Sequence, residues 1–499
     1  LQLLGRRVPR RFFLAPRLLW ELLVQAGHSF LPRMTTGRLP AAGADNQFLA
    51  MRLYSRLAYL YWFHGGKLAC AWAHLRGMNL AERYGASPEL GQAWSEHAPV
   101  MTMLPWYRRG VRYAQRSLDV RRRLGDAWGQ GQSLSFAGLI RYAASDFEAA
   151  ESALHEAVRL LRRTGDQWEV NTASWNLALC RLRTGDLRQA IDICRQTFEA
   201  ARAIGDQTAA GVALSIWARA ADGRIPLELL REQFELRLGD ARTTAELLLA
   251  EALVHRRQGE LPAAIDSIER GLKTIKDAGL RQEYIAPLFA WHATLLRELA
   301  EATPTYAPDI RTARTRAAAR AARRAMRWAR AYRNNEPHAR RELGLLAAAQ
   351  GHGRVAQLQL ARSAGAARRI GARYEEALTK LAQAELGAAR SDAPSSSAEL
   401  AEALGAVRGF DPVLARAPGT PQAGAALSVF DRFSTLLKVG HAIASATTEP
   451  GLEAAVRDSA LRLLRAERCH VVATAAIYDP TITTRSGEDL GGVSRTLLM

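Results

Sequence analysis

A glycine recurs at a fixed interval along much of this chain, and each follows a basic stretch with helical periodicity. Gly85, Gly125, Gly165 and Gly205 lie 40 residues apart, and the last three each precede an aspartate. A glycine after a periodic stretch is typical of a helix C-terminus, because it adopts a left-handed conformation without a Cβ clash. The aspartate that follows can cap the next helix. This spacing predicts an array of helix pairs joined by short turns.

A second turn signal divides each repeat, and small residues stand at three fixed offsets from it. Examples of this turn are Ser145-Asp146, Gly185-Asp186 and Gly259-Glu260. Small side chains at such offsets let the two helices of a pair cross closely. Six repeats carry a small residue at all three offsets: Ala58/Cys70/Gly77, Ala98/Gly110/Ser117, Gly138/Ala150/Ala157, Ala178/Ala190/Thr197, Ala252/Ala264/Gly271 and Gly344/Ala356/Ser363.

The segment from Trp175 to Arg202 carries the repeat pattern most clearly. It contains Leu177-Ala178, Gly185-Asp186 and Ala190-Ile191 in that order. It resembles the tetratricopeptide repeat, which implies stacked helix pairs around a shared core and a concave binding surface. We therefore expect residues 47–389 to form an all-α, tetratricopeptide-like superhelix of about eight units. The unit around Gly223 departs from the pattern and is expected to be short and irregular, and helices are expected at about 284–301 and 310–332.

The regions outside the array have different compositions. Residues 1–46 are predicted to be a connector with an amphipathic helix at 14–31, and residues 390–428 a flexible linker rich in Ala, Pro, Ser and Gly that holds one short helix at 398–407. Residues 429–499 begin with two amphipathic helices, followed by a strand at 469–477. This piece resembles the opening of a GAF domain, which implies a small, truncated α/β unit whose ligand is unknown.

The order of connector, repeat array, linker and GAF-like piece resembles a type of large bacterial signalling protein. In that family a Ser/Thr kinase or an AAA-type ATPase lies upstream, and a histidine kinase or cyclase lies downstream. We therefore expect both ends to be cut from a longer polypeptide, and this chain to be a protein-interaction and signal-relay region. Two alternatives stay open: the sensor arm of an ATP-dependent transcriptional regulator, and binding of nucleic acid or an acidic partner through arginines.

No complete active site is predicted. Gly65-Gly66-Lys67 lacks the spacing of a phosphate-binding loop, and His155-Glu156 lacks the second histidine of a zinc-protease helix. The four cysteines form no metal-binding pair and are expected to be reduced thiols of a cytoplasmic protein. We expect no enzyme activity, metal or cofactor. Because the apolar stretch at 14–31 contains charged residues and is shorter than a membrane span, no membrane partner is expected.

The expected partner is a protein, or a flanking domain of the same polypeptide, bound in the concave groove. Four polar residues predicted on groove-facing helices are candidates for contacting it: Asn176, Arg183, Arg256 and Arg257. The net charge of +19 invites a nucleic-acid hypothesis, but charge alone indicates non-specific attraction, and nucleic acid is not expected as the main partner. A stripe with helical spacing adds five candidates for phosphate or acidic groups: Arg316, Arg320, Arg323, Arg327 and Arg330.

Overall fold

The structure, a computed structural model, describes residues 1–410 apart from 64–65, 103–104, 237–239, 305 and 390–393, together with positions 448 and 454. The residues up to 410 lie in one compact unit, Leu1–Pro418. All regular elements in this part of the chain are helical, and a single isolated β-bridge joins Leu39 to Tyr84. Apart from positions 448 and 454, the GAF-like piece predicted at 429–499 lies outside the described residues.

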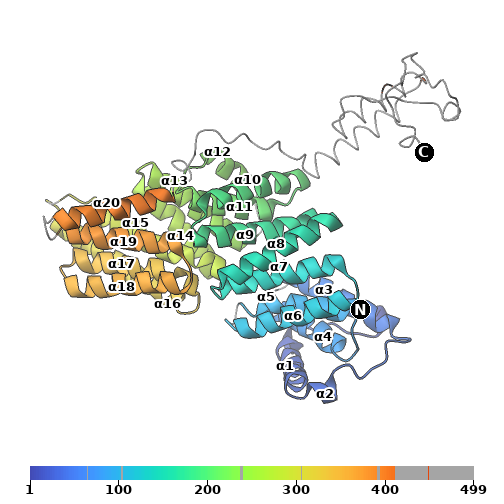
Figure 1. Ribbon diagram of the computed structural model, residues 1–499. Coiled ribbons are helices and arrows are strands. Elements are labelled where there is room, and N and C mark those ends of the chain that lie inside the picture. The colour runs from blue at the N-terminus through green and yellow to red at the C-terminus, as the bar shows by residue number, and fades with distance from the viewer. Residues whose placement is uncertain are drawn as a thin grey trace, which may run out of the picture. The chain divides into compact units, whose positions relative to one another are not determined.

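Nine helix pairs follow one another through the described residues (Figure 1). The first helices of the pairs are α3 (Asp45–Phe63), α5 (Pro88–Val100), α7 (Ala127–Ala143), α9 (Gln167–Thr184), α11 (Gln207–Ala220), α13 (Ala241–Arg257), α15 (Pro287–Glu301), α17 (Glu336–Ala349) and α19 (Arg373–Ala388). The second helices are α4 (Lys67–Ala81), α6 (Tyr107–Arg123), α8 (Phe147–Thr164), α10 (Leu187–Ile204), α12 (Leu227–Glu235), α14 (Leu261–Asp277), α16 (Pro308–Ala329), α18 (Gly353–Arg369) and α20 (Pro394–Gly409). The predicted all-helical repeat is confirmed. Pairing continues through α20, inside the range predicted as a linker, because α20 packs against α19.

The turns form as the glycine and aspartate pattern predicts. Gly185 ends α9 in the left-handed region with φ 94°, where a Cβ would lie 2.6 Å from the Phe410 ring. Asp186 then caps α10 by accepting a hydrogen bond from the Gln189 amide at 3.2 Å. Gly85 is an exception, because its φ is not positive. There the chain leaves α4 through the Tyr84 bridge instead of a tight turn.

The predicted small residues lie where the helices cross. All eighteen residues of the six triads are buried except Cys70, which is partly exposed. A Cβ on Gly138 would lie 2.4 Å from Leu154 Cγ and 3.2 Å from the Ala150 carbonyl oxygen. Any larger side chain at this crossing would push α7 away from α8, so the spacing of the pair depends on these residues.

The irregular units also follow expectation. Helix α12, after Gly223, has only nine residues. Two short 3₁₀ segments, η3 (Glu283–Ile285) and η4 (Arg333–Asn335), precede α15 and α17. Helix α16 matches the helix predicted at 310–332, and its alanines 318, 321 and 325 are buried against the array as expected.

The N-terminal region contains η1 (Gln2–Leu4), η2 (Arg11–Phe13), α1 (Leu14–Phe30) and α2 (Pro32–Thr35). Helix α1 packs against α4. No helix among the described residues is long and apolar enough to cross a membrane.

Candidate functional site

The first helices of the pairs form the inner layer of the array. Neighbouring first helices pack against one another, whereas second helices of neighbouring pairs touch far less in the described part of the chain. In a curved stack the layer with the closer spacing lies on the concave side. Functional side chains are therefore to be sought first on α3, α5, α7 and the other odd-numbered helices.

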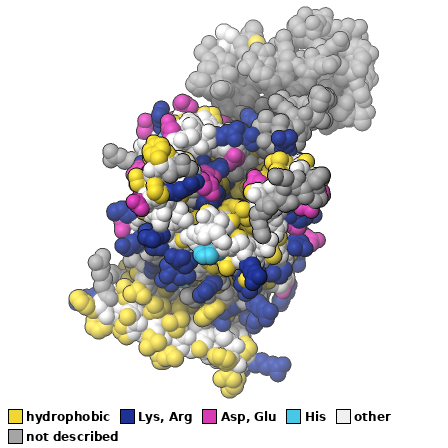
Figure 2. Space-filling view, turned by 90° about the vertical axis from the view of Figure 1, so that its left-hand side faces the viewer, with side chains coloured by type: hydrophobic (Ala, Val, Ile, Leu, Met, Phe, Trp, Pro, Cys, Tyr) yellow, Lys and Arg dark blue, Asp and Glu magenta, His cyan; other side chains and the backbone are white. Residues whose placement is uncertain are grey.

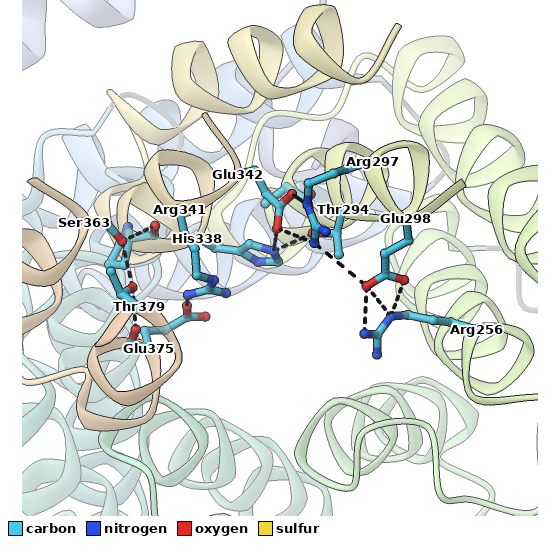
Figure 3. A network of polar contacts seen from close by, with 12 residues as sticks. Arg256, Thr294, Arg297, Glu298, His338, Arg341, Glu342, Ser363, Glu375 and Thr379 are labelled. Atoms are coloured by element: carbon cyan, nitrogen blue, oxygen red, sulfur yellow. Dashed lines mark hydrogen bonds and ion pairs between the residues drawn. The ribbon is translucent and has the colours of Figure 1, made fainter. Parts of the chain in front are cut away.

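A ladder of ion pairs runs along this inner layer from α13 to α19 (Figure 3). Its members, here called the inner ladder, are Arg256, Arg297, Glu298, His338, Arg341, Glu342 and Glu375. The shortest N–O distances are 2.8 Å for Arg256–Glu298, 2.7 Å for Arg297–Glu342 and 2.5 Å for Arg341–Glu375. Each pair joins one first helix to the next, so the ladder fixes the spacing of four consecutive helices.

Burial and neighbouring charge set the ionisation of the ladder. Burial opposes ionisation of Glu375, but the Arg341 and His338 charges outweigh it and lower the Glu375 pKa to about 2. Burial, helped by the Arg341 charge, lowers the pKa of His338 to about 4. At neutral pH the Glu342 and Glu375 carboxylates are therefore ionised and matched by arginines, and Glu298 is paired with Arg256, so no free binding group is left among these pairs.

A second group of contacts, the central cluster, ties the two halves of the array together. Its members are Tyr142 on α7, Arg183 on α9, Glu283 in η3, and Asn334 and Asn335 in η4. Arg183 donates hydrogen bonds to the Asn334 carbonyl oxygen at 3.1 Å and to Asn335 Oδ1 at 3.0 Å, and its Nη2 lies 3.5 Å from Glu283 Oε1. Asn334 donates to the Tyr142 carbonyl oxygen at 2.9 Å. These contacts join segments 100 to 192 residues apart in sequence.

Further polar contacts close the same interface. Tyr107 donates to the Ala331 carbonyl oxygen at 3.0 Å. Lys67, at the start of α4, donates to the carbonyl oxygens of Ala278 and Gly279, just after α14. Ser145, which takes a left-handed φ of 68° in the turn after α7, donates to Asn334 Oδ1 at 2.6 Å. The curvature of the array is thus held by hydrogen bonds and ion pairs as well as by apolar packing.

Two buried carboxyl groups have a strongly raised pKa: Glu283 in the central cluster and Glu246, whose charge also interacts with Arg219. Burial raises the pKa of Glu283 to about 7, although Arg183 acts in the opposite direction. Burial likewise raises the pKa of Glu246 on α13 to about 7, although Arg242 pairs with it at 3.2 Å. The second oxygen of Glu283, Oε2, is buried and has no hydrogen-bond partner in the described part of the chain. Such groups titrate near neutral pH.

Arg219 on α11 stands beside these groups. Its charge interacts with those of Arg183, Tyr142, Glu246 and Glu283, yet no described residue forms a hydrogen bond or ion pair with it. Burial and the Arg183 charge lower its pKa. A partly buried guanidinium with unused donors is suited to a carboxylate or phosphate, which it binds through two parallel hydrogen bonds.

The five predicted arginines, four on α16 and Arg330 just after it, are here called the arginine face and are all exposed. None of Arg316, Arg320, Arg323, Arg327 and Arg330 forms a hydrogen bond or ion pair with another described residue. Four of them, from Arg320 onward, line a hollow of about 430 Å³ together with Met326 and Leu343. The stripe therefore offers free cations around a partly apolar floor.

The other four predicted site residues lie elsewhere and have partners. Asn176 is buried; it donates to the Thr172 carbonyl oxygen and accepts from the Tyr284 hydroxyl. Arg183 is buried in the central cluster. Arg256 pairs with Glu298 and Asp222, and Arg257 pairs with Asp222. A partner in the groove would have to displace these contacts to reach them.

The sequence interpretation missed Arg219, Glu283, Asn334 and Asn335. Arg219 could have been found from the sequence, since it is the one charged residue of α11. The others lie in short irregular segments whose neighbours cannot be derived from helical spacing. No group of three or more metal-binding side chains occurs among the described residues.

Comparisons with known proteins bear on the fold. No protein-family model and no curated protein matches the sequence. A Rap protein complexed with Competence and Sporulation Factor aligns over 74% of this chain and 99% of its own, with 9% identity and a TM-score of 0.51. The apo quorum sensor NprR from B. thuringiensis aligns over 71% and 98%, with 12% identity and a TM-score of 0.46. A signal transduction ATPase with a tetratricopeptide repeat sensor from Pyrococcus horikoshii aligns over 73% and 54%, with 16% identity and a TM-score of 0.40.

At these identities the likeness is one of architecture. The described part of the chain has a tetratricopeptide-like helical repeat fold. This conclusion is supported by the helix pairs, by the small residues at their crossings and by the likeness to the Rap structure.

Proposed function

We propose that the repeat array is a non-catalytic interaction and relay region that binds a carboxylate-bearing protein segment at Arg219. The observation that carries this proposal is the unpartnered guanidinium of Arg219 beside the central cluster. A ligand carboxylate at Arg219 would compete for the contacts of Arg183 with η3 and η4. Binding would thereby alter how the two halves of the array are held together, which is the physical requirement for a relay.

The Rap structure gives independent support for this use of the fold, since it is a complex with the Competence and Sporulation Factor. In the longer signalling protein that the domain order resembles, the altered array would act on catalytic domains of the same cytoplasmic polypeptide. The GAF-like piece at 429–499 would connect the array to a downstream kinase or cyclase.

The test is a selection of random peptides against the whole chain, followed by fluorescence anisotropy with the selected peptides. Replacing Arg219 by Gln removes the charge and is expected to weaken binding at least about tenfold, because hydrogen bonds to charged groups contribute about 1.5–3 kcal/mol. Arg163→Gln, at an exposed arginine of α8 outside the arginine face, is the matched control and should bind normally. Hydrogen exchange in η3 and η4 should change when peptide binds.

Peptides that bind equally well to the Arg219→Gln variant would contradict the proposed site. ATP hydrolysis by the purified chain, or phosphoryl transfer from it, would contradict the non-catalytic assignment.

A second candidate function is binding of an acidic partner at the arginine face. The five arginines span about 21 Å at 1.5 Å per residue, and their hollow has the apolar side chains of Met326 and Leu343. An acidic segment with one apolar anchor fits this combination better than a bare phosphate chain does. Polyglutamate and duplex DNA are suitable probes: Arg320→Gln/Arg323→Gln/Arg327→Gln should weaken polyglutamate binding, and preferential binding of DNA would favour the nucleic-acid alternative.

A further inference from the structure

Helix α1 is packed with its polar side inward. Glu21, Gln25 and His28 are its buried residues. Glu21 pairs with Arg76 at 3.1 Å and accepts a hydrogen bond from Asn79 at 2.8 Å, and His28 lies 2.7 Å from Glu82. Gln25 donates a hydrogen bond to the Tyr113 hydroxyl on α6 (Tyr107–Arg123) at 3.1 Å, so each of these residues has a partner on α4, just after it, or on α6. The helix is fixed to the array through these contacts, and its apolar side is left outside.

The outward side of α1 and the residues just before it are strongly apolar. Six large side chains are more than half exposed there: Phe12, Phe13, Leu19, Trp20, Leu23 and Phe30. Phe12 is 94% exposed and Trp20 58%. Positions 19, 23 and 30 are separated by about one and about two turns, so they fall on one helical face, and position 20 lies at its edge. Figure 2 shows hydrophobic side chains gathered at the lower end of the molecule, where α1 and α2 lie in Figure 1.

Basic side chains flank this apolar face. Residues 1–44 contain seven arginines and a single acidic residue, Glu21, which is buried and paired. Arg7, Arg10, Arg17 and Arg33 are exposed, and no described residue forms an ion pair with them. The surface therefore combines exposed aromatic and aliphatic groups with unneutralised positive charge.

We propose that the outward face of α1 docks on an anionic membrane surface. A helix that lies in the membrane interface buries Trp, Phe and Leu side chains among the lipid headgroups and keeps basic residues beside the lipid phosphates. Charge complementarity favours this occupant over a second copy of the chain, because two copies meeting here would bring fourteen arginines together. The sequence showed no membrane span, and a helix lying on the surface needs none.

The proposal is tested by co-sedimentation of the whole chain with vesicles of phosphatidylcholine, with or without phosphatidylserine. Binding is expected only with phosphatidylserine and should weaken at high salt. Arg7→Gln/Arg10→Gln/Arg17→Gln/Arg33→Gln should weaken it more than about a hundredfold, since each arginine near such a surface contributes about a factor of five. Trp20→Ser/Leu23→Ser, which leaves the charge unchanged, should weaken it at least about tenfold through lost apolar burial.

The matched control is Arg316→Gln/Arg320→Gln/Arg323→Gln/Arg327→Gln, which removes the same charge from α16 and should leave vesicle binding intact. Equal loss in this control would show that net charge alone attracts the chain, and would overturn the proposal. Absence of binding, or concentration-dependent self-association abolished by Trp20→Ser/Leu23→Ser, would also overturn it. All substituted residues are exposed, and circular dichroism checks that every variant remains folded.

Discussion

Gly138→Ala gives a direct test of the helix crossings. In an open helical position this change stabilises a protein by about 0.5–1 kcal/mol, because glycine loses more conformational freedom on folding. At Gly138 the new Cβ would stand 2.4 Å from Leu154 Cγ, well inside contact distance, and 3.2 Å from the Ala150 carbonyl oxygen. Leu154 is fully buried and has little room to move.

The magnitude follows from these two effects. Overpacking a well-filled core costs about 1–3 kcal/mol, and a clash that involves a buried leucine and backbone belongs in the upper half of that range. Subtracting the helix gain leaves a net loss of about 1–2 kcal/mol for Gly138→Ala. Gly365→Ala in α18 is the matched control, since the nearest atom to its Cβ would be the flexible end of Arg369 at 3.7 Å. That variant should gain about 0.5–1 kcal/mol.

Urea unfolding followed by circular dichroism measures the two changes, and hydrogen exchange in α7–α8 and α17–α18 locates them. Local readout is needed because repeat arrays unfold in parts. The two identical substitutions should differ in sign. If Gly138→Ala proved as stable as the parent chain, the close approach of α7 and α8 would not be what the glycine serves, and the explanation of the triads would fail.

Changes at three other positions test the central cluster and the inner ladder. Glu283→Gln should stabilise the protein by about 1–3 kcal/mol at pH 8, because a carboxyl with a pKa of about 7 in the folded state and 4.5 ordinarily is costly to ionise when buried. The folded state binds more protons than the unfolded state between these values, so unfolding free energy falls as pH rises from about 4.5 to 7, and this slope should shrink in the variant. Arg341→Met should destabilise by about 3 kcal/mol, because it leaves the Glu375 carboxylate buried without its partner. Ser145→Ala should cost about 1 kcal/mol through the lost hydrogen bond to Asn334, whereas Ser145→Gly should be near neutral, since it also relieves the left-handed backbone.

Thermal and urea unfolding across pH measure all three. A Glu283→Gln variant with the parent's pH profile would show that this carboxyl does not titrate near neutrality. An Arg341→Met variant of unchanged stability would mean that the inner ladder does not hold the helices. A Ser145→Ala variant of unchanged stability would exclude a contribution from the hydrogen bond to Asn334. Because both Ser145 substitutions remove that bond, equal effects would mean that glycine relieves no backbone strain there.

The local rules of the fold were readable from the sequence. Turn glycines, capping aspartates and the small triads depend only on residues within one repeat, so their spacing predicts the helix pairs and their crossings. The same holds for the arginine face, because helical periodicity places Ala318 and Ala325 opposite the arginines, and both alanines are buried.

The contacts of the central cluster could not be predicted from spacing within one repeat. Arg183 was predicted to face a groove and contact a partner, but it contacts η4, about 150 residues later. The contact between Arg183 and η4 depends on the curvature of the array. Each helix crossing contributes a small rotation to that curvature, and the rotations add up over many repeats. Spacing within one repeat does not determine this sum. The packing of α1 is similar: its periodicity shows an amphipathic helix, but only its buried pairs with α4 reveal that the polar side faces inward.

The chemistry of the central cluster adds a consequence for ligand binding at Arg219. Glu246 and Glu283 both have a pKa near 7 and both interact with the Arg219 charge. A ligand carboxylate at Arg219 would offset that positive charge and raise both pKa values further, so binding would draw protons from solution. By linkage, affinity should then increase as pH falls from 8 toward 6. Anisotropy titrations of a selected peptide across this range measure the effect, and Glu283→Gln should reduce it. Affinity that is independent of pH would mean that the ligand binds away from these carboxyl groups.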